Sequence, residues 1–259
     1  MGDDLQEEPA SKVTDPKELW DKTFEAAIRD SAYNLVPPEP IVRTLSYFLR
    51  SRYKPEDYGK LRFLDLGCGA GATIIWLARK GLRVSGIDIS PEALKLCEHH
   101  IDRRLNYDEY NRVSPLKCGN VTNMPWDDET FDGICSANVL QHLNKEERVD
   151  AFSEIRRLLK RGGCYVGYEM SRQHCMFNAA HRQQLHDDPG TIIFEEGGGY
   201  GLGNVGLTHF FSYDELFEGL RGFISVDPCS VIYQIPVEEA KRRHITGRIW
   251  AFWNVLGVK

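Results

Sequence analysis

The sequence lacks three features that would direct it to particular classes of protein. No apolar run approaches the roughly 20 residues that a membrane-spanning helix needs. The first twelve residues are acidic, where a signal peptide would be basic and then apolar. The seven cysteines are scattered and never spaced CxxC, which argues against a disulfide framework and against a zinc knuckle. We therefore expect a soluble, cytoplasmic protein with no membrane partner and no bound metal.

Positive charge is also in short supply. The formal net charge is −6 at pH 7, so the chain has no overall positive field with which to attract RNA or DNA. The basic residues that do gather lie on expected outer helices, where they are more easily solvated than arranged as a phosphate track: Arg103, Arg104, Arg156, Arg157, Lys160 and Arg161. We expect a small-molecule partner rather than a nucleic acid, and the sequence does not indicate an oligomeric state.

The length of 259 residues allows one well-buried domain with additions. Residues 1–14 are polar and acidic, which predicts a disordered tail. Residues 15–58 predict an N-terminal helical cap, and 59–259 the main domain. Within that domain the segment 171–209 lacks a regular pattern, and we expect it to be an insertion that shapes a substrate pocket.

From about residue 61 onward, short apolar runs alternate with helical segments, which is typical of βαβ units around a parallel sheet. The expected strands are 61–66, 83–88, 114–118, 131–136 and 164–169, and the helices between them are 72–80, 91–105 and 145–159. Two helices at 16–28 and 41–53 come before this core. A helix at 212–220 and two closing strands at 223–235 and 248–256 follow it. The glycine-rich segment 195–206 predicts a mobile loop.

A glycine-rich turn joins the first strand of the core to its helix in the sequence LDLGCGAGA. Gly67, Gly69 and Gly71 allow a sharp bend and let a ligand come close to the backbone and to the helix N-terminus. A dinucleotide fingerprint needs GxGxxG, whereas the spacing here is GxGxG with Asp65 two positions before it. The spacing therefore disfavours an NAD-linked dehydrogenase.

The turn DLGCGAG resembles the DxGxGxG signature of class I S-adenosylmethionine-dependent methyltransferases. GIDIS resembles the acidic ribose-binding position of that family, and GNVTNMPWDDETFDGICSANVLQHL resembles its adenine-binding stretch and fourth strand. RLLKRGGCYVG and RIWAFWNVLGVK resemble the turn before the fifth strand and the inserted last strand. The resemblance implies S-adenosyl-L-methionine as cofactor. It also implies an α/β, Rossmann-like fold: a mostly parallel seven-stranded sheet with one antiparallel strand and helices on both faces.

The resemblance also implies roles for individual residues. Asp88 would hold the two ribose hydroxyls, and Asp65 would face the methionine end of the cofactor. Asn120 stands where the family commonly has Asp, and its side-chain oxygen can still accept from the adenine amino group. Trp20 and Phe24 lie one helical turn apart, as lid residues or as plain helix packing. The full expected cofactor set is Trp20, Asp65, Gly67, Cys68, Gly69, Asp88, Ile89, Asn120, Val121, Ala137 and Asn138.

Methyl transfer from a sulfonium can rely on alignment alone, so a catalytic base is optional. His142 follows the fourth strand and is the first candidate, with a helix-start histidine bonded to the backbone as the alternative. Tyr168 ends the fifth strand and could face substrate or pack in the sheet. His174 lies in the insertion with His181 and His186, without the compact spacing of a zinc motif, so these three are also read as solvated loop residues.

The favoured interpretation is a methyltransferase that acts on a small molecule through an O, N, S or C atom. An RNA or protein methyltransferase is the nearest alternative, and it would need a basic face or a peptide groove. A non-catalytic module that binds S-adenosylmethionine is the other, since one fold serves many functions.

Overall fold

The computed structural model describes residues 15–178, 182–194, 206–242 and 247–259. The predicted tail, His181 and residues 195–205 of the predicted mobile loop lie outside the described residues. None of the helices in the described part of the chain has the length and apolar character needed to cross a bilayer.

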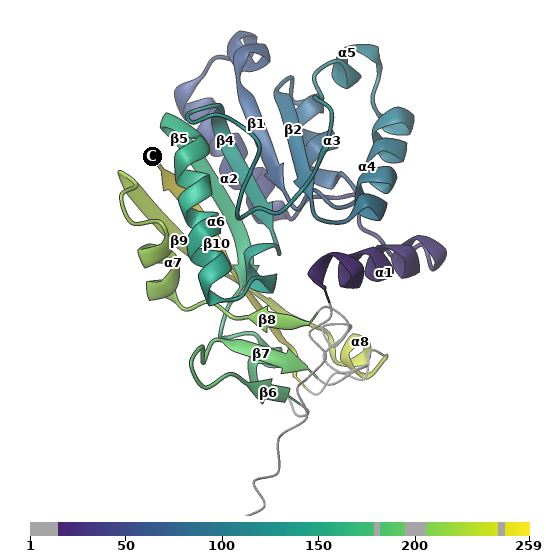
Figure 1. The fold of residues 1–259 in the computed structure, drawn as a ribbon, viewed down its shortest axis with the longest axis vertical. Coiled ribbons are helices and arrows are strands. Elements are labelled where there is room, and N and C mark those ends of the chain that lie inside the picture. The colour runs from purple at the N-terminus through teal and green to yellow at the C-terminus, as the bar shows by residue number, and fades with distance from the viewer. Residues whose placement is uncertain (1–14, 179–181, 195–205, 243–246) are drawn as a thin grey trace, which may run out of the picture.

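A seven-stranded sheet forms the centre of the molecule, in the order β3-β2-β1-β4-β5-β10-β9 (Figure 1). The strands are β1 (Arg62–Leu66), β2 (Arg83–Asp88), β3 (Lys117–Cys118), β4 (Phe131–Ala137), β5 (Leu159–Met170), β9 (Ser225–Gln234) and β10 (Ile249–Val258). β10 runs antiparallel to both of its neighbours, and the other pairs are parallel. The prediction of a mostly parallel sheet with one antiparallel strand is confirmed.

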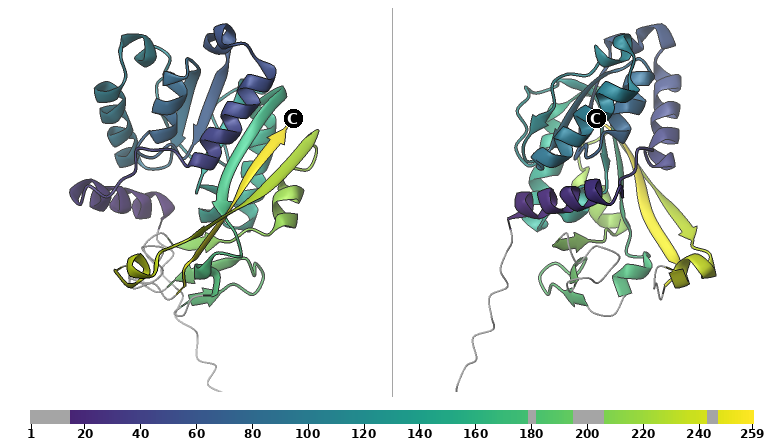
Figure 2. Two further views of the ribbon diagram at one scale, coloured as in Figure 1. Left: turned by 180° about the vertical axis from the view of Figure 1, so that it is seen from behind. Right: turned by 90° about the vertical axis from the view of Figure 1, so that its right-hand side faces the viewer.

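Helices cover both faces of this sheet, as predicted (Figure 2). They are α1 (Pro16–Arg29), α2 (Glu39–Arg52), α3 (Ala72–Arg79), α4 (Pro91–Arg104), α5 (Tyr107–Tyr110), α6 (Lys145–Leu158), α7 (Tyr213–Gly219) and α8 (Val237–Arg242), with short 3-10 turns η1 (Pro55–Lys60), η2 (Leu140–His142) and η3 (Cys175–Asn178). Apolar residues of α2, α3 and α4 share one buried cluster with β1 and β2. Those of α6 and α7 share another on the opposite face.

Capping residues and apolar stripes explain where several helices begin and what they bury. At the start of α1, Asp15 accepts from the Lys17 amide and Pro16 occupies the first helical position. Asn144 and Glu147 form a reciprocal capping box at the start of α6. That helix buries one apolar face, whose residues recur at helical spacing: Ala151, Phe152, Ile155 and Leu158. Local signals and the burial pattern therefore agree on the position of α6.

The predicted helical cap 15–58 is divided in the structure. α2 packs in the core, where Ile41, Leu45 and Phe48 are buried against the sheet. Asn254 of β10 donates its side-chain amide to Thr44 at 2.7 Å. α1, in contrast, has no buried residue and lies across the end of the molecule where the parallel strands finish (Figure 1). Only α1 has the position of a cap.

The inserted segment contains a small antiparallel sheet that the sequence analysis did not predict. Its strands are β6 (Arg182–Gln184), β7 (Thr191–Phe194) and β8 (Leu207–His209). Ile192 and Phe194 pack with Phe210 in a separate apolar cluster. A buried ion pair of 2.8 Å between Arg148 of α6 and Asp188 anchors the insertion to the main domain.

Two boundaries also differ from the prediction. β5 begins at Leu159 rather than at residue 164, because the expected turn pairs with β4 through a register shift between Phe131 and Gly133. α8 was not expected, because it lies between the two closing strands, where the apolar pattern is weak. Neither change alters the end of the sheet at which β1, β2 and β4 finish.

Candidate functional site

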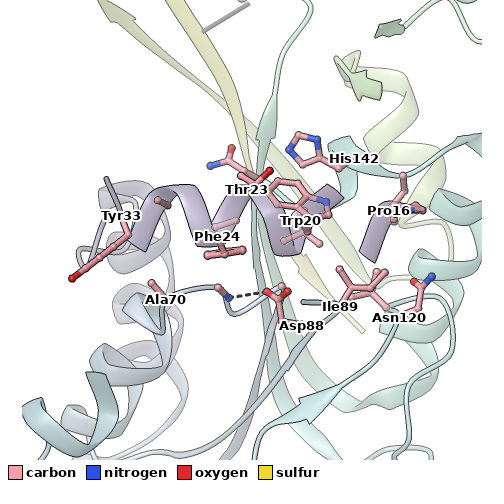
Figure 3. Close-up of a pocket in the computed structure, with 18 of the residues that line it drawn as sticks. Pro16, Trp20, Thr23, Phe24, Tyr33, Ala70, Asp88, Ile89, Asn120 and His142 are labelled. Atoms are coloured by element: carbon pink, nitrogen blue, oxygen red, sulfur yellow. Dashed lines mark hydrogen bonds between the residues drawn. The ribbon is translucent and has the colours of Figure 1, made fainter. Parts of the chain in front are cut away.

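A cavity of about 430 Å³ lies at the carboxyl ends of β1, β2 and β4, beneath α1 (Figure 3). The sheet order reverses between β1 and β4, and open α/β folds bind ligands at such a point. A second cavity of about 410 Å³ adjoins it and shares Gly67, Ala137 and Asn138 with it. The two volumes fall in the range of small-molecule sites.

The cavities bring together every residue of the expected cofactor set. Those that border the larger cavity are Trp20, Gly67, Gly69, Asp88, Ile89, Asn120, Val121, Ala137 and Asn138. Asp65 and Cys68 border the smaller one. Residues as far apart in sequence as α1 and the end of β4 therefore meet around one space.

The turn after β1 requires glycine on two grounds. Gly67, Gly69 and Gly71 have φ angles of 57°, 49° and 89°, a region in which side chains are strained. A Cβ at Gly67 would stand 2.5 Å from a methyl of Val139, and one at Gly71 would stand 2.7 Å from the sulfur of Cys97. The bend can thus pass close to its neighbours only without side chains.

The amide groups of this turn are largely used inside the protein. Cys68 N–H donates to Ile87 O at 3.0 Å, Gly69 N–H to Asp88 Oδ2 at 2.9 Å and Gly71 N–H to Cys68 O at 2.9 Å. The first amides of a helix have no acceptor within it, and the start of α3 borders the smaller cavity. The first amides of α3 are therefore available to an anionic ligand group, whereas those of Cys68, Gly69 and Gly71 are engaged within the protein.

Two buried carboxylates flank the turn without a cation. Burial, and secondly the charge of Asp88, raise the pKa of Asp65 well above its ordinary value. Burial also raises the pKa of Asp88, although the amides of Ser90 and Gly69 donate to it and oppose the change. Among the described residues neither carboxylate forms an ion pair. A ligand that brings an ammonium group and hydroxyl donors would relieve this cost.

The wall beside β2 and β3 suits a flat, mostly apolar ring. Ile89 and Val121 offer aliphatic side chains, and Asn120 lies at the rim (Figure 3). Asn120 Oδ1 accepts from the Thr122 amide at 3.1 Å, and a carbonyl oxygen can accept a second bond. The residues present therefore fit the adenosyl part of S-adenosylmethionine.

α1 places aromatic rings over the cavity. Trp20 and Phe24 both line it, and the ring of Phe24 would lie 3.4 Å from a Cβ at Gly69. The Trp20 ring also stands edge-on to His142, with centroids 5.0 Å apart. Asp21, on the same helix, accepts from Ser90 Oγ at the start of α4 and so attaches α1 to the main domain.

His142 lines the cavity, but both of its ring nitrogens are engaged. Nδ1 lies 3.4 Å from Leu207 O, which can only accept, so Nδ1 carries the proton. Nε2 then accepts from the side-chain amide of Gln141 at 3.2 Å. Burial lowers the pKa of His142 from 6.5 to about 4, despite the bond to Leu207. These contacts make His142 a neutral, fixed part of the wall.

Tyr168 and His174 lie elsewhere. Tyr168 is buried on the sheet with its ring stacked on Phe252 at 4.6 Å, and burial raises its pKa. His174 is buried among Phe210, Trp250 and Phe252, and its Nδ1 accepts from the Met176 amide at 3.2 Å. Neither residue borders the two cavities, so neither is placed to contact a ligand there.

The expected set omits several residues that line the larger cavity. Tyr33 and Asn34 come from the turn after α1, where no periodic pattern marks a site. Val139 and Leu143 lie just after the fourth strand, within the motif that resembled the family's adenine-binding stretch and fourth strand. That motif could therefore have located them. Glu147 lies in the first turn of α6, and its role in the capping box concealed it.

Residues 64–167 match a family model described as a methyltransferase domain. A 24-methylenesterol C-methyltransferase 2 from Oryza sativa subsp. japonica is 36% identical over 109 residues, which are 42% of this chain and 28% of that relative. A demethylmenaquinone methyltransferase from Symbiobacterium thermophilum is 29% identical over 134 residues, covering 51% of this chain and 49% of the relative. The chain thus spans half or less of the length of these curated relatives.

Solved structures share the fold over more of the chain. A methyltransferase from Methanosarcina mazei has a TM-score of 0.59 at 22% identity, covering 77% of this chain and 92% of that one. A phosphoethanolamine N-methyltransferase 2 from Haemonchus contortus, solved with S-adenosyl-L-methionine, has a TM-score of 0.63 at 18% identity, covering 96% and 60%. Residues 64–167 thus match a methyltransferase domain, and the described fold is that of S-adenosylmethionine-dependent methyltransferases of known structure.

Proposed function

We propose that this protein transfers a methyl group from S-adenosylmethionine to a small-molecule acceptor. The observation that carries the proposal is the pair of buried carboxylates, Asp65 and Asp88, on either side of the glycine turn with no cation partner among the described residues. A neutral or anionic ligand would leave their burial uncompensated. The cofactor supplies an ammonium group, which would be a cation beside these carboxylates, and two ribose hydroxyls as further donors.

The other residues of the cavity fit the remaining parts of the cofactor. Ile89 and Val121 would hold the adenine ring, with Asn120 accepting from its amino group. The N-terminus of α3 would receive the carboxylate of the methionine part. When bound, the cofactor supplies a methyl group already activated by a positively charged sulfur.

The task left to the protein is to align the acceptor and to exclude water. α1 covers the cavity with Trp20 and Phe24, and an aromatic ring near a sulfonium gains cation–π attraction. His142 is held neutral by burial, and its Nε2 lone pair is occupied by Gln141, so we assign it a positioning role and not that of a general base. Alignment is then the main source of rate.

A small acceptor is supported by the walls of the cavity and by the relatives. Trp20, Val139 and Leu143 give it an apolar lining. The insertion 171–209 reaches this space, because Leu207 O lies 3.4 Å from His142 Nδ1. We propose that α1 and the insertion together enclose the acceptor. The curated relatives include enzymes named for a 24-methylenesterol, for demethylmenaquinone and for norajmaline, all of which are small molecules.

The test is release of S-adenosylhomocysteine from a panel of acceptors. We expect turnover with one class of apolar small molecule, and none with total RNA or with unfolded protein. Turnover confined to RNA or protein would replace the proposed acceptor class. Tight binding of the cofactor without turnover on any acceptor would instead indicate a binding module.

A further inference from the structure

The inner wall of the larger cavity is a short loop that joins β4 to η2 and η2 to α6. Ala137, Asn138, Val139 and His142 of this loop all border the cavity. Asn138 has a φ angle of 58°, a left-handed conformation that costs energy unless the surroundings impose it. The loop 137–142 therefore needs support from behind.

That support comes from Glu169, which lies one residue before the end of β5 and is fully buried. Its Oε1 accepts from Ser136 Oγ at 2.6 Å, and its Oε2 accepts from the Gln141 amide at 3.3 Å. The nearby amides of Leu140 and Val139 also favour the charged form of this carboxylate. Glu169 thus ties the loop to the end of β4, through the Gln141 amide and the Ser136 hydroxyl.

The contacts continue from Glu169 to the cavity surface. The Gln141 side chain accepts from the Met170 amide at 3.0 Å and donates to His142 Nε2 at 3.2 Å. His142 in turn meets the edge of Trp20 on α1. The main-chain bonds to Glu169 fix Gln141, and Gln141 fixes the ring that faces the cavity.

We propose that Glu169 is a positioning residue for the cofactor cavity: its deprotonated carboxylate holds the 137–142 loop in the binding geometry, and protonation releases it. The proposal rests on the proposed function, since it concerns the same cofactor site. A carboxylate can accept from all of these donors. A protonated carboxyl carries one O–H, and this hydrogen would face a donor and displace one of the hydrogen bonds. Loss of an amide partner would let the strained Asn138 relax.

Titration of this network lies near neutral pH. Burial raises the pKa of Glu169 from 4.5 to about 7, although Ser136 and the three amides favour the charged form. Among the described residues no ion pair to Glu169 compensates for its burial. Ser136 contacts Glu169 directly, and Tyr165 contacts Ser136. His142 is linked to Glu169 through Gln141. Trp253 of β10 is paired with Glu169 in the sheet.

Within this network Glu169 alone changes charge between pH 6 and 8. Burial lowers the pKa of His142 to about 4. Burial, and secondly the charge of Glu169, raise the pKa of Tyr165 well above 10. We therefore expect the part of the cofactor affinity that depends on Glu169 to fall by about tenfold from pH 8 to pH 6, since one linked proton gives at most a tenfold change per pH unit below its pKa.

The experiment measures the dissociation constant of S-adenosylhomocysteine by calorimetry at pH 6 and pH 8. In Glu169→Gln the affinity at both pH values should be no higher than that of the wild type at pH 6, and the roughly tenfold fall that the wild type shows from pH 8 to pH 6 should be absent. Glu154→Gln is the matched control, because Glu154 also holds a loop amide, that of Met124, but lies away from the cavity. It should retain the wild-type dependence on pH.

Ser136→Ala provides a second variant that keeps the loop contacts. Removal of its hydroxyl takes away a donor to the carboxylate, so the midpoint of the binding profile should move above pH 7. An unmoved midpoint, or a Glu169→Gln variant that keeps the wild-type ratio between pH 6 and 8, would overturn the inference. A wild-type protein that binds at neither pH would instead refute the proposed function.

Discussion

Replacement of Asp88 by alanine tests how the site holds its ligand. Asp88 ends β2, and its two oxygens accept from the amides of Ser90 at 3.0 Å and Gly69 at 2.9 Å. Each oxygen retains a lone pair that can accept from a ribose hydroxyl. The substitution therefore removes both the ligand contacts and two bonds that shape the glycine turn.

The magnitude depends on these bonds. A hydrogen bond to a charged group contributes about 1.5–3 kcal/mol, and we expect a net loss of about 1–3 kcal/mol in cofactor binding, or roughly 5- to 150-fold in Kd. The loss of stability should be smaller than two lost bonds would suggest. Burial raises the pKa of Asp88, which shows that its charge is costly in the folded state.

The assay is titration calorimetry with S-adenosylhomocysteine, beside urea unfolding of the same samples. Asp132→Ala is the matched control, because Asp132 accepts from the Arg62 amide at 2.9 Å and pairs with Lys160 at the opposite end of the sheet. It should lose stability and keep its affinity. Unchanged affinity in Asp88→Ala would mean that the ribose assignment is wrong.

Three further predictions concern the turn, the cap and the pH dependence of stability. Gly67→Ala should lose about 1–3 kcal/mol of stability and most of its cofactor affinity, because its Cβ would meet Val139. Gly81→Ala is the control: Gly81 is also left-handed, but its Cβ would lie 3.8 Å from Tyr58, so this variant should lose stability alone. Equal cofactor affinities of the two variants by calorimetry would contradict this. Trp20→Ala should weaken cofactor binding by about 0.5–1.5 kcal/mol with little change in melting temperature, since α1 buries no residue, and a large drop in melting temperature would show that α1 is part of the core. The pKa of Glu169 is about 7 in the folded state and 4.5 ordinarily, so between these pH values the folded protein holds a proton that the unfolded chain has lost. The free energy of unfolding in urea should therefore fall from pH 4.5 to pH 7.5 by about 3 kcal/mol more in the wild type than in Glu169→Gln. Parallel pH curves for the two proteins would refute the assignment.

Local signals in the sequence located most of the fold. The alternation of apolar runs placed the core strands, and the helix predicted at 212–220 corresponds to α7, which begins with a capping box of Ser212 and Glu215. The glycine spacing with Asp65 and Asp88 indicated the cofactor site, because these residues lie on consecutive strands whose ends must meet. Such features depend on neighbours in sequence or on one topological rule.

Other features depend on contacts between distant segments, which no local pattern records. Tyr168 and Glu169 end the same strand, and the sequence alone could not say which side chain would face the cavity loop. In the structure Tyr168 stacks on Phe252 of β10, while Glu169 accepts from the Gln141 amide in the loop after β4. The small sheet β6–β8 was missed for the same reason, since its strands are short and find their partners across the insertion.

The most direct test of the central claim is a crystal structure of the protein with S-adenosylhomocysteine. We predict both ribose hydroxyls within hydrogen-bond distance of the Asp88 carboxylate, the ammonium group beside Asp65, and the adenine ring against Ile89 and Val121 beneath α1. A ligand bound elsewhere, or in these cavities with its ribose turned away from Asp88, would contradict the account.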